Sequence, residues 1–422
     1  MLHKNYGCKS VLGYALLAAT TAYADTSADQ WLPDGHVSGD IRVYDFSRDY
    51  GNSSKLSNLH SFSLGGKLKV ETSSSDGMGA ALGVYFAQDI GLNNHDQNNK
   101  YINPLLMGTG YGIYTLGEAY VQYQKPEFLA RVGNQSIDNP WINPGDGFMI
   151  PNLYQGVTVA VTPIEGLKFE SDRVLSFKNR TVSGFENSNL FALPYDNPQF
   201  TGSNNGAFAF GATYKNDHAN IKTWLYNFYD FAKMSYMEGG YKFPMGGVAP
   251  FVDFEYMRET GSGSQYLGAV DSRLYGARVG STLPDQLGKV YFAYDTIPYN
   301  NAAGISNGNL LSPYTQVYNT DPLFTTVMNY GLVSARGAGH AWLVGMTLKP
   351  LEDRLDIIPT ISRYNTAPYT VANVNAFMLD IAYHLGGSLK GISIRNRLGI
   401  EQGIPLWGGN YVDERIMLQY VF

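Results

Sequence analysis

The chain has 422 residues, a formal net charge of −6 and charged side chains at only 16% of positions, where soluble domains average roughly 25%. This acidic balance argues against a nucleic-acid-binding surface. Tyrosine, phenylalanine and glycine are abundant, with 32, 21 and 47 copies. We find no linker, charge block or low-complexity tract, so a single aromatic-rich domain is expected.

Residues 1–24 have the features of a secretory signal peptide. Lys4 and Lys9 precede a short apolar stretch, and Ala22-Tyr23-Ala24 is a small-x-small cleavage sequence. The apolar stretch is shorter than the about 20 residues that a transmembrane helix requires. The only cysteine, Cys8, lies in the removed segment, so the mature chain is expected to be exported and free of disulfides.

Beyond the signal peptide, apolar and polar side chains alternate with the period of two that indicates half-buried strands. In one early segment, Leu68 and Val70 alternate with Lys67, Lys69 and Glu71. The same alternation recurs in segments 115–124, 128–135, 157–162, 208–214, 252–256, 275–279, 377–384 and 392–397. Helical periodicity of any length is missing.

Long connections rich in Asn, Gly, Ser and Pro, at 93–112, 183–205 and 299–339, alternate with tight ones such as 215–219. Long outer loops and short periplasmic turns are typical of outer-membrane barrels. With about 10 residues per strand and roughly 22 per strand plus connection, residues 25–422 would form about 18 strands, or 16. We therefore predict one all-β domain, a transmembrane antiparallel β-barrel wide enough for an aqueous lumen.

The last strand supports this assignment. Ile416, Leu418, Tyr420 and Phe422 fall on one face, and the chain ends on an aromatic residue. This pattern is typical of the closing strand of an outer-membrane barrel. It predicts a Gram-negative outer membrane as the location, membrane lipid around the wall, and the barrel-assembly machinery as a partner of this strand.

Charged residues of both signs fall on the polar face, which would line the lumen. The predicted basic track is Arg42, Lys67, Lys69, Arg131, Arg278, Arg395, Arg397 and Arg415. The predicted acids are Asp40, Glu71, Glu118, Asp253, Glu255 and Asp380. Fixed cations in a pore attract carboxylates. Two alternatives stay open: a lumen that only needs to be polar, and a transverse field between opposed charges.

The segment 134–151 follows the strand that contains Arg131, and its three prolines and two glycines make it irregular and stiff. Unpaired backbone at membrane depth is tolerated against protein or a water-filled cavity. If the segment folds inward, Asp138, Trp141 and Asp146 lie near the narrowest point. The alternative is an ordinary surface loop with Pro-Gly turns.

Motifs for catalysis are missing: we find no His-Glu-x-x-His, Gly-x-Ser-x-Gly or phosphate-binding loop, and no cysteine pair for a metal. No cofactor or metal is expected. An outer-membrane barrel enzyme, a lipid or peptide hydrolase, remains an alternative because a catalytic triad could assemble from distant strands. A hydrophobe transporter and a soluble exported binding protein are two further alternatives.

Several segments resemble the OprD family of outer-membrane porins. They are 62–72, 87–93, 116–123 and 131–151. Past residue 180 the similarity is general, apart from 355–363 and 413–422, which resemble the closing strands of the family. The resemblance implies a monomeric 18-stranded channel with a constriction loop after the Arg131 strand. It also implies an Arg/Lys track that passes small carboxylate-bearing nutrients, such as amino acids or small organic acids, and incidental passage of some antibiotics. Arg131 is the first constriction candidate by position and Arg42 the second.

These expectations converge on a porin that lets small polar solutes diffuse passively into the periplasm. Replacing Arg131 with Ala is then expected to change ion preference and solute uptake without preventing assembly, because lumen substitutions tune passage. Reversal potentials in planar bilayers measure the effect, and an unchanged value would count against a role for Arg131.

Overall fold

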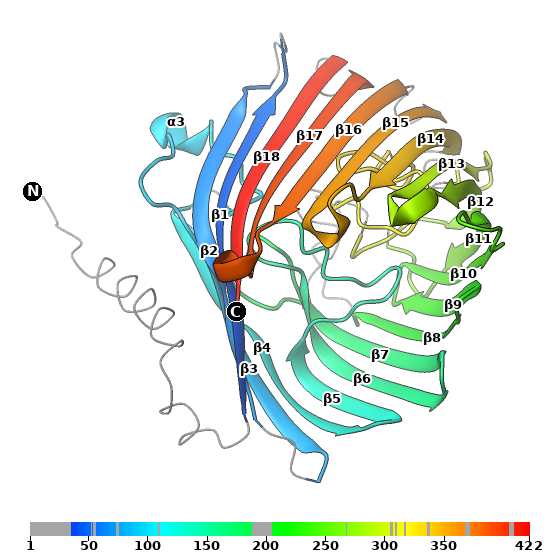
Figure 1. Ribbon diagram of the computed structural model, residues 1–422, viewed down its shortest axis with the longest axis horizontal. Helices are drawn as coiled ribbons and strands as arrows, with labels where there is room; N and C mark the ends of the chain where they lie inside the picture. Colours follow the sequence, from blue (N-terminus) through cyan, green and yellow to red (C-terminus); the bar gives the residue numbers. More distant parts are fainter. Residues whose placement is uncertain are drawn as a thin grey trace, which may run out of the picture.

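The computed structural model describes residues 35–422 apart from 52, 54–55, 73–75, 109, 188–204, 267, 304–306, 309, 316–317, 336–337, 368–371 and 405–408. The predicted signal peptide, residues 1–24, lies outside the described residues. Figure 1 shows the barrel and the segments that cross its interior.

Within the described residues, eighteen strands form one sheet in which each strand is antiparallel to the next. The strands are β1 (His36–Asp49), β2 (Leu59–Glu71), β3 (Met78–Gln88), β4 (Gly112–Lys125), β5 (Phe128–Gln135), β6 (Leu153–Ile164), β7 (Leu167–Lys178), β8 (Ala207–Lys215), β9 (Ala219–Phe228), β10 (Ala232–Lys242), β11 (Pro250–Gly261), β12 (Asp271–Thr282), β13 (Gly288–Ile297), β14 (Ala338–Leu348), β15 (Leu355–Ala367), β16 (Ala372–His384), β17 (Ile392–Ile404) and β18 (Gly409–Val421).

Pairing of β18 with β1 closes the barrel, with Ile41 opposite Tyr420 and Phe46 opposite Arg415. The predicted all-β barrel of 18 strands is therefore confirmed, and the alternative of 16 strands is wrong. Helical structure in the described part is limited to α3 (Asp96–Asn99) and the 3₁₀ turns η1 (Pro284–Gln286), η2 (Glu352–Arg354) and η3 (Gly387–Leu389). None of the helices among the described residues has the length and apolar composition needed to cross a membrane.

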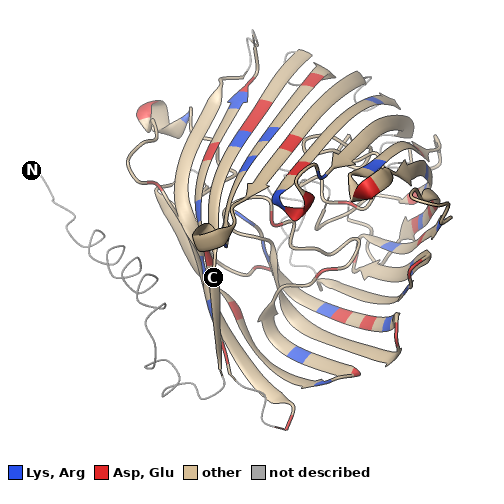
Figure 2. Cartoon of the chain, viewed as in Figure 1, with Lys and Arg blue, Asp and Glu red and all other residues tan. Residues whose placement is uncertain are grey.

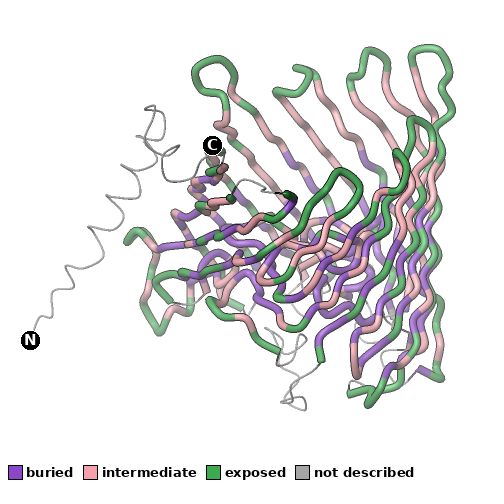
Figure 3. The backbone as a smooth tube through the Cα atoms, turned by 90° about the horizontal axis from the view of Figure 1, so that it is seen from below, coloured by how far each residue is buried: buried purple, intermediate pink, exposed green. Residues whose placement is uncertain are grey.

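The alternation of side chains becomes an outer and an inner face. In β11, Phe254 is 60% exposed whereas the neighbouring Glu255 is 3% exposed. Figure 3 shows the same alternation of exposed and buried positions along the wall, with buried segments gathered inside. Because the side-chain period is two, a shift of one residue would turn the polar set toward lipid, so the pattern fixes the register.

The closing strand has the same two faces. Ile416 and Leu418 are exposed on the outside, whereas Arg415, on the opposite face of the same strand, is buried. The terminal Phe422 extends the ladder, since its N–H and carbonyl bond to the backbone of Gly39 at 3.1 and 3.0 Å. The end of the chain is thus part of the seam that closes the barrel.

The longest connections, 89–111, 136–152, 179–206 and 298–337, all follow odd-numbered strands and so start from the same end of the barrel. Turns such as 126–127 and 165–166 lie at the other end. By the rule for outer-membrane barrels, the long connections are extracellular and the short turns periplasmic. This end-to-end asymmetry agrees with the sequence-based expectation.

Replacing Phe422 with Asp is expected to impair insertion, because the seam strand would end on a charge at the lipid face. Gln419→Asp is the matched control, since Gln419 lies opposite Arg42 on the inner face of the same strand. Heat-modifiable mobility and surface levels measure insertion. Equal surface levels for the two variants would refute the assigned faces of β18.

Candidate functional site: two loops inside the barrel

The connection 136–152 folds into the barrel rather than over its rim. Its residues Trp141, Ile142 and Ile150 are fully buried. Asn152 N–H donates to the Pro144 carbonyl at 2.8 Å, so the segment folds back on itself. Figure 1 shows this segment crossing the space enclosed by the strands. We call residues 136–152 the first inner loop.

Arg42 on β1 holds the first inner loop in place. Its Nη1 and Nη2 donate to the two carboxylate oxygens of Asp146 at 2.5 and 2.8 Å. Nη1 also donates to the Phe148 carbonyl at 2.6 Å, and Tyr44 on the same strand donates its hydroxyl to the Gly147 carbonyl at 2.9 Å. A bidentate guanidinium–carboxylate pair is among the stronger polar contacts. The tip of the loop is therefore fixed against β1.

Glycines on both sides of Asp146 let the loop pass close to two further arginines. Gly145 has a φ of +49°, and a Cβ there would clash with Nη2 of Arg180. A Cβ on Gly147 would lie 3.4 Å from Nη1 of Arg397. The Gly-Asp-Gly tip is thus surrounded by guanidinium groups from Arg42, Arg180 and Arg397.

The charges at the tip perturb two groups in the connections. Burial alone would raise the pKa of the Asp146 carboxyl, but the hydrogen bonds and charge of Arg42 outweigh it and lower the pKa below 3.8. Burial lowers the pKa of Arg180 to about 10. Both groups are therefore ionised at neutral pH, and the pair with Arg42 is an ion pair.

A second connection, 298–337, also folds inward, and we call it the second inner loop. Carboxylates of the wall accept its backbone N–H groups: Glu255 accepts from Phe324 at 3.0 Å and Asp295 from Thr325 at 2.7 Å. The loops are joined where Asn143 Nδ2 donates to the Thr320 carbonyl at 2.8 Å. The second inner loop thus braces the first.

Apolar packing fills much of the lumen around the loops. One buried cluster joins inward residues of β6 to β16 with Trp141 and with the second inner loop, including Leu310, Tyr314 and Leu332. A second cluster joins Phe148 to inward residues of β1, β3 and β4. Charged side chains are nevertheless present on strands around the whole wall (Figure 2).

Four of the predicted basic residues lie together on β1, β17 and β18. Arg397 is opposite Arg415 in the register. Arg395 donates to both oxygens of Asp380 at 2.8 and 2.5 Å, and Arg397 Nε lies 3.1 Å from the same carboxylate. We call the set on these strands the basic row: Arg42, Arg395, Arg397 and Arg415.

Arg415 connects the basic row to the second inner loop. Its Nη2 donates to Asn329 Oδ1 at 2.5 Å, and its Nε donates to Asp413 at 2.5 Å. The guanidinium also lies 4.8 Å from the centre of the Phe148 ring. From the closing strand, Arg415 thus contacts Phe148 of the first inner loop and Asn329 of the second.

Three other predicted bases form a separate group on β2 and β5. Lys69 lies 3.2 Å from Glu71 and 3.0 Å from Glu118. Arg131 donates to Gln122 at 2.8 and 3.0 Å and covers the ring of Tyr120 at 4.2 Å. The third member, Lys67, lies 6.0 Å from the ring centre of Tyr85.

Arg131 and Arg42, the first and second constriction candidates, make different contacts. Arg131 bonds to β4, the neighbouring strand, whereas Arg42 holds the tip of the first inner loop. The last predicted base, Arg278, pairs with Asp253 at 2.8 Å and lies 4.4 Å from the ring centre of Phe324 in the second inner loop. It acts as a brace for that loop.

Five of the six predicted acids lie against a predicted base: Asp40 with Arg42, Glu71 and Glu118 with Lys69, Asp253 with Arg278, and Asp380 with Arg395 and Arg397. Glu255 differs, because it is buried and accepts the N–H of Phe324. Most predicted acids therefore neutralise neighbouring bases locally.

The three loop candidates have different surroundings. Asp146 forms the tip bound by Arg42, and Asp138 lines a cavity on the other side of the loop. Trp141 is 0% exposed and packs edge-on against Tyr236, with ring centres 5.9 Å apart. Trp141 therefore contributes to the apolar packing and presents no surface to water.

Sequence reasoning missed the second inner loop and Arg180. The sequence shows that the connection 299–339 is long. Its apolar residues Leu310, Leu311 and Leu323, which are buried in the structure, are the sequence signal for an inward fold. Arg180 follows β7 in an irregular connection, where period-two reasoning assigns no face. Among the described residues, no group of three or more His, Cys, Asp or Glu side chains is arranged to hold a metal ion.

A closed barrel of this size, narrowed by inward-folded loops, defines an outer-membrane porin. The sequence matches the outer membrane porin, OprD family, over residues 29–309. The chain therefore belongs to the OprD family, and it resides in the outer membrane of a Gram-negative bacterium. No match was found among curated proteins.

Solved structures share the fold. OccK9 (OpdG) of Pseudomonas aeruginosa is 15% identical with a TM-score of 0.76, covering 93% of this chain and 99% of that chain. OpdK of the same organism, solved with vanillate, is 14% identical with a TM-score of 0.74, covering 93% and 99%. OccK2 (OpdF), also of that organism and in complex with glucuronate, is 13% identical with a TM-score of 0.73, covering 93% and 98%.

Replacing Asp146 with Asn is expected to loosen the loop tip, because the ion pair with Arg42 is lost. Single-channel recordings at neutral pH should show increased current noise in the variant. Since the pKa of Asp146 is lowered, the pair is complete above 3.8 and is lost as the pH falls through the lowered value. The wild type should therefore become noisy only in strong acid, and a quiet variant would refute the anchoring role.

Proposed function

We propose that this porin is a passive, substrate-preferring channel for small polar solutes that carry a carboxylate, such as amino acids or small organic acids. In this proposal the chain catalyses no reaction and acts as a monomer surrounded by outer-membrane lipid. Residues 25–422 would form the mature barrel after removal of residues 1–24, with the barrel-assembly machinery acting on β18.

The observation that carries the proposal is the basic row beside the loop tip. Arg395, Arg397 and Arg415 come from two adjacent strands, and Arg42 follows on the next strand across the seam. Arg42 and Arg397 of this row, together with Arg180, surround the segment Gly145 to Gly147. A carboxylate that passes the tip would exchange one guanidinium partner for the next.

Arginine suits this role because its planar guanidinium binds carboxylates in a bidentate manner and stays charged. The surrounding apolar packing strengthens the attraction, since low-dielectric walls focus the field of fixed charges. Asp380 and Asp413 partly neutralise the row. The two carboxylates weaken the binding of an anionic solute to the arginines, so that the solute can leave the row as well as enter it.

Two related channels add support for the solute class. OpdK was solved with vanillate and OccK2 (OpdF) with glucuronate, and both ligands carry a carboxylate. These two proteins are only 14% and 13% identical to this chain, so the residues of their loops differ from those of this chain at most positions. For this chain we therefore infer only that its solutes carry a carboxylate, and nothing about the rest of the solute molecule.

Replacing Arg397 with Gln tests the proposal. Arg397 faces the loop tip without anchoring it, so the barrel should assemble and conduct while the anion-to-cation permeability ratio falls about twofold. Arg397→Lys should keep most of the preference. Reversal potentials under a salt gradient and uptake of butyrate into proteoliposomes measure the change.

Arg273→Gln is the matched control, because Arg273 is exposed on the outer face of β12. It removes the same charge from the chain without altering the lumen. Equal reversal potentials for the Arg397 and Arg273 variants would overturn the proposed role of the basic row.

A further inference from the structure

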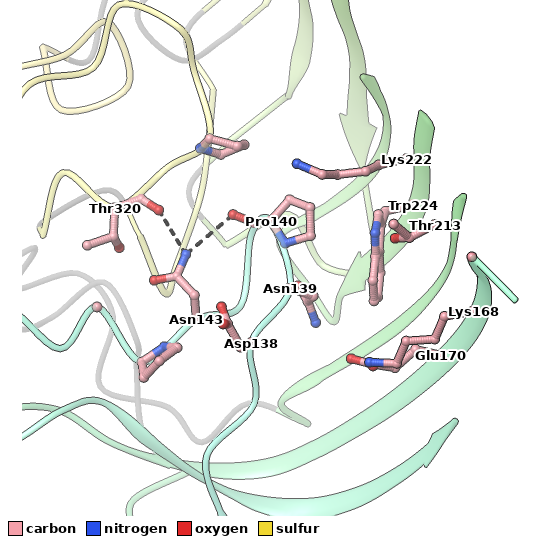
Figure 4. Close-up of a pocket in the computed structure, with 14 residues that line it drawn as sticks. Asp138, Asn139, Pro140, Asn143, Lys168, Glu170, Thr213, Lys222, Trp224 and Thr320 are labelled. Carbon is pink, nitrogen blue, oxygen red and sulfur yellow. Dashed lines mark hydrogen bonds and ion pairs between the residues drawn. The ribbon is translucent and has the colours of Figure 1, made fainter. Parts of the chain in front are cut away.

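A cavity of about 600 Å³ lies on the side of the first inner loop away from the basic row. One wall is formed by the two inner loops and the other by the inner faces of β7, β8 and β9 (Figure 4). In Figure 1 these strands lie across the barrel from β1 and β18. The cavity borders the loop tip at Gly145, but none of the arginines of the basic row is among its lining residues.

The strand wall presents a row of hydrogen-bond donors. Lys168 is opposite Thr213 in the register of β7 and β8, and Thr213 is opposite Lys222 in that of β8 and β9. Adjacent strands are about 4.8 Å apart. Two ammonium groups with a hydroxyl between them thus face the cavity, and we call these residues the donor row.

Each lysine of the donor row forms an ion pair with a glutamate. Lys168 pairs with Glu170, and Lys222 lies 2.8 Å from Glu238. The lysine side chains are 51% and 33% exposed, whereas each glutamate is 8% exposed. Because an ammonium has three donors, each lysine keeps N–H groups for a ligand. The two ion pairs are neutral overall.

The loop wall presents an acceptor. Asp138 is exposed to the cavity, and among the described residues its carboxylate has neither a hydrogen-bond nor an ion-pair partner. Asn143 completes this wall, since its Nδ2 bridges the carbonyls of Pro140 and Thr320 at 3.4 and 2.8 Å. Asp138 is therefore the charged lining residue that has no partner of opposite charge.

Pro140 and Trp224 supply apolar lining between the two walls (Figure 4). The indole of Trp224 lies directly over Gly211, where a Cβ would clash with the ring. The glycine thus makes room for the indole on the strand wall. A short hydrocarbon chain that bridges the walls would contact these two side chains.

We propose that this cavity is a second binding site, selective for small zwitterions. The ligand carboxylate binds the donor row and its ammonium binds Asp138, with the linking carbons against Pro140 and Trp224. A simple anion would leave Asp138 without a partner, whereas a zwitterion pairs with both walls, which distinguishes this site from the basic row. The inference rests on the proposed channel function, because the solute must enter the lumen to reach the site.

The site lies toward the periplasmic end. Lys168 follows the short turn 165–166, and Lys222 follows the short turn 216–218. A solute that has passed the loop tip would meet the cavity before it leaves the barrel. The periplasmic compartment of a planar bilayer is therefore the side from which to add the probes.

Three probes of matched length separate the two charges: 4-aminobutyrate, pentanoate, which lacks the ammonium, and butylammonium, which lacks the carboxylate. The measurement is the concentration that half-blocks single-channel current through the full-length protein. In the wild type, 4-aminobutyrate should block at the lowest concentration. Asp138→Asn should raise that concentration about tenfold, as loss of a charge-assisted hydrogen bond predicts.

Lys222→Gln should weaken the block by 4-aminobutyrate without affecting that by butylammonium. Asp217→Asn is the matched control for Asp138→Asn. Asp217 has the same charge as Asp138, but it is exposed in the short turn after β8 at the periplasmic end. Unchanged half-blocking concentrations of 4-aminobutyrate in both Asp138→Asn and Lys222→Gln would overturn the second site.

The test distinguishes this inference from the proposed function. If pentanoate permeates and the Arg397 variant loses anion preference, the channel function holds whatever the result at Asp138. If the wild type passes no carboxylate from either side, the proposed function fails. Equal block by pentanoate and 4-aminobutyrate in a conducting wild type refutes the zwitterion site alone.

Discussion

Every other feature of this protein depends on one constraint, that backbone N–H and C=O groups in a bilayer must be paired with each other. The pairing of β18 with β1 meets it, because it removes the two edges of an eighteen-stranded sheet. Closure also creates an inside and an outside, so each strand contributes one apolar and one polar face. The lumen, its charges and its loops are consequences of that seam.

Within the lumen, backbone that leaves the sheet needs other partners. Arg42 supplies donors for the first inner loop through Asp146 and the Phe148 carbonyl. Glu255 and Asp295 supply acceptors for the N–H groups of the second inner loop. Charged side chains of the wall thus have a structural task before any transport role. Mutations of these groups should therefore be judged by loop position as well as by selectivity.

The two inner loops divide the interior into chemically different regions. On the side facing β1, β17 and β18, the guanidinium groups of Arg42 and Arg397 lie against Gly145 to Gly147. The side facing β7 to β9 combines lysine–glutamate pairs with Asp138. The same loop therefore contacts both regions, through Asp146 on one side and Asp138 on the other. The solute preference that we propose therefore depends on where the loops lie as well as on the composition of the wall.

The sequence by itself determined the class of fold, the faces of the strands and the approximate strand number, because a period of two is a local property. It also identified the stiff segment 134–151. Only the tertiary structure decided that Arg42 anchors this segment, that Trp141 is buried, and that the described part of residues 298–337 folds inward. These outcomes depend on contacts such as that of Arg42 with Asp146, 104 positions apart, which no local pattern encodes.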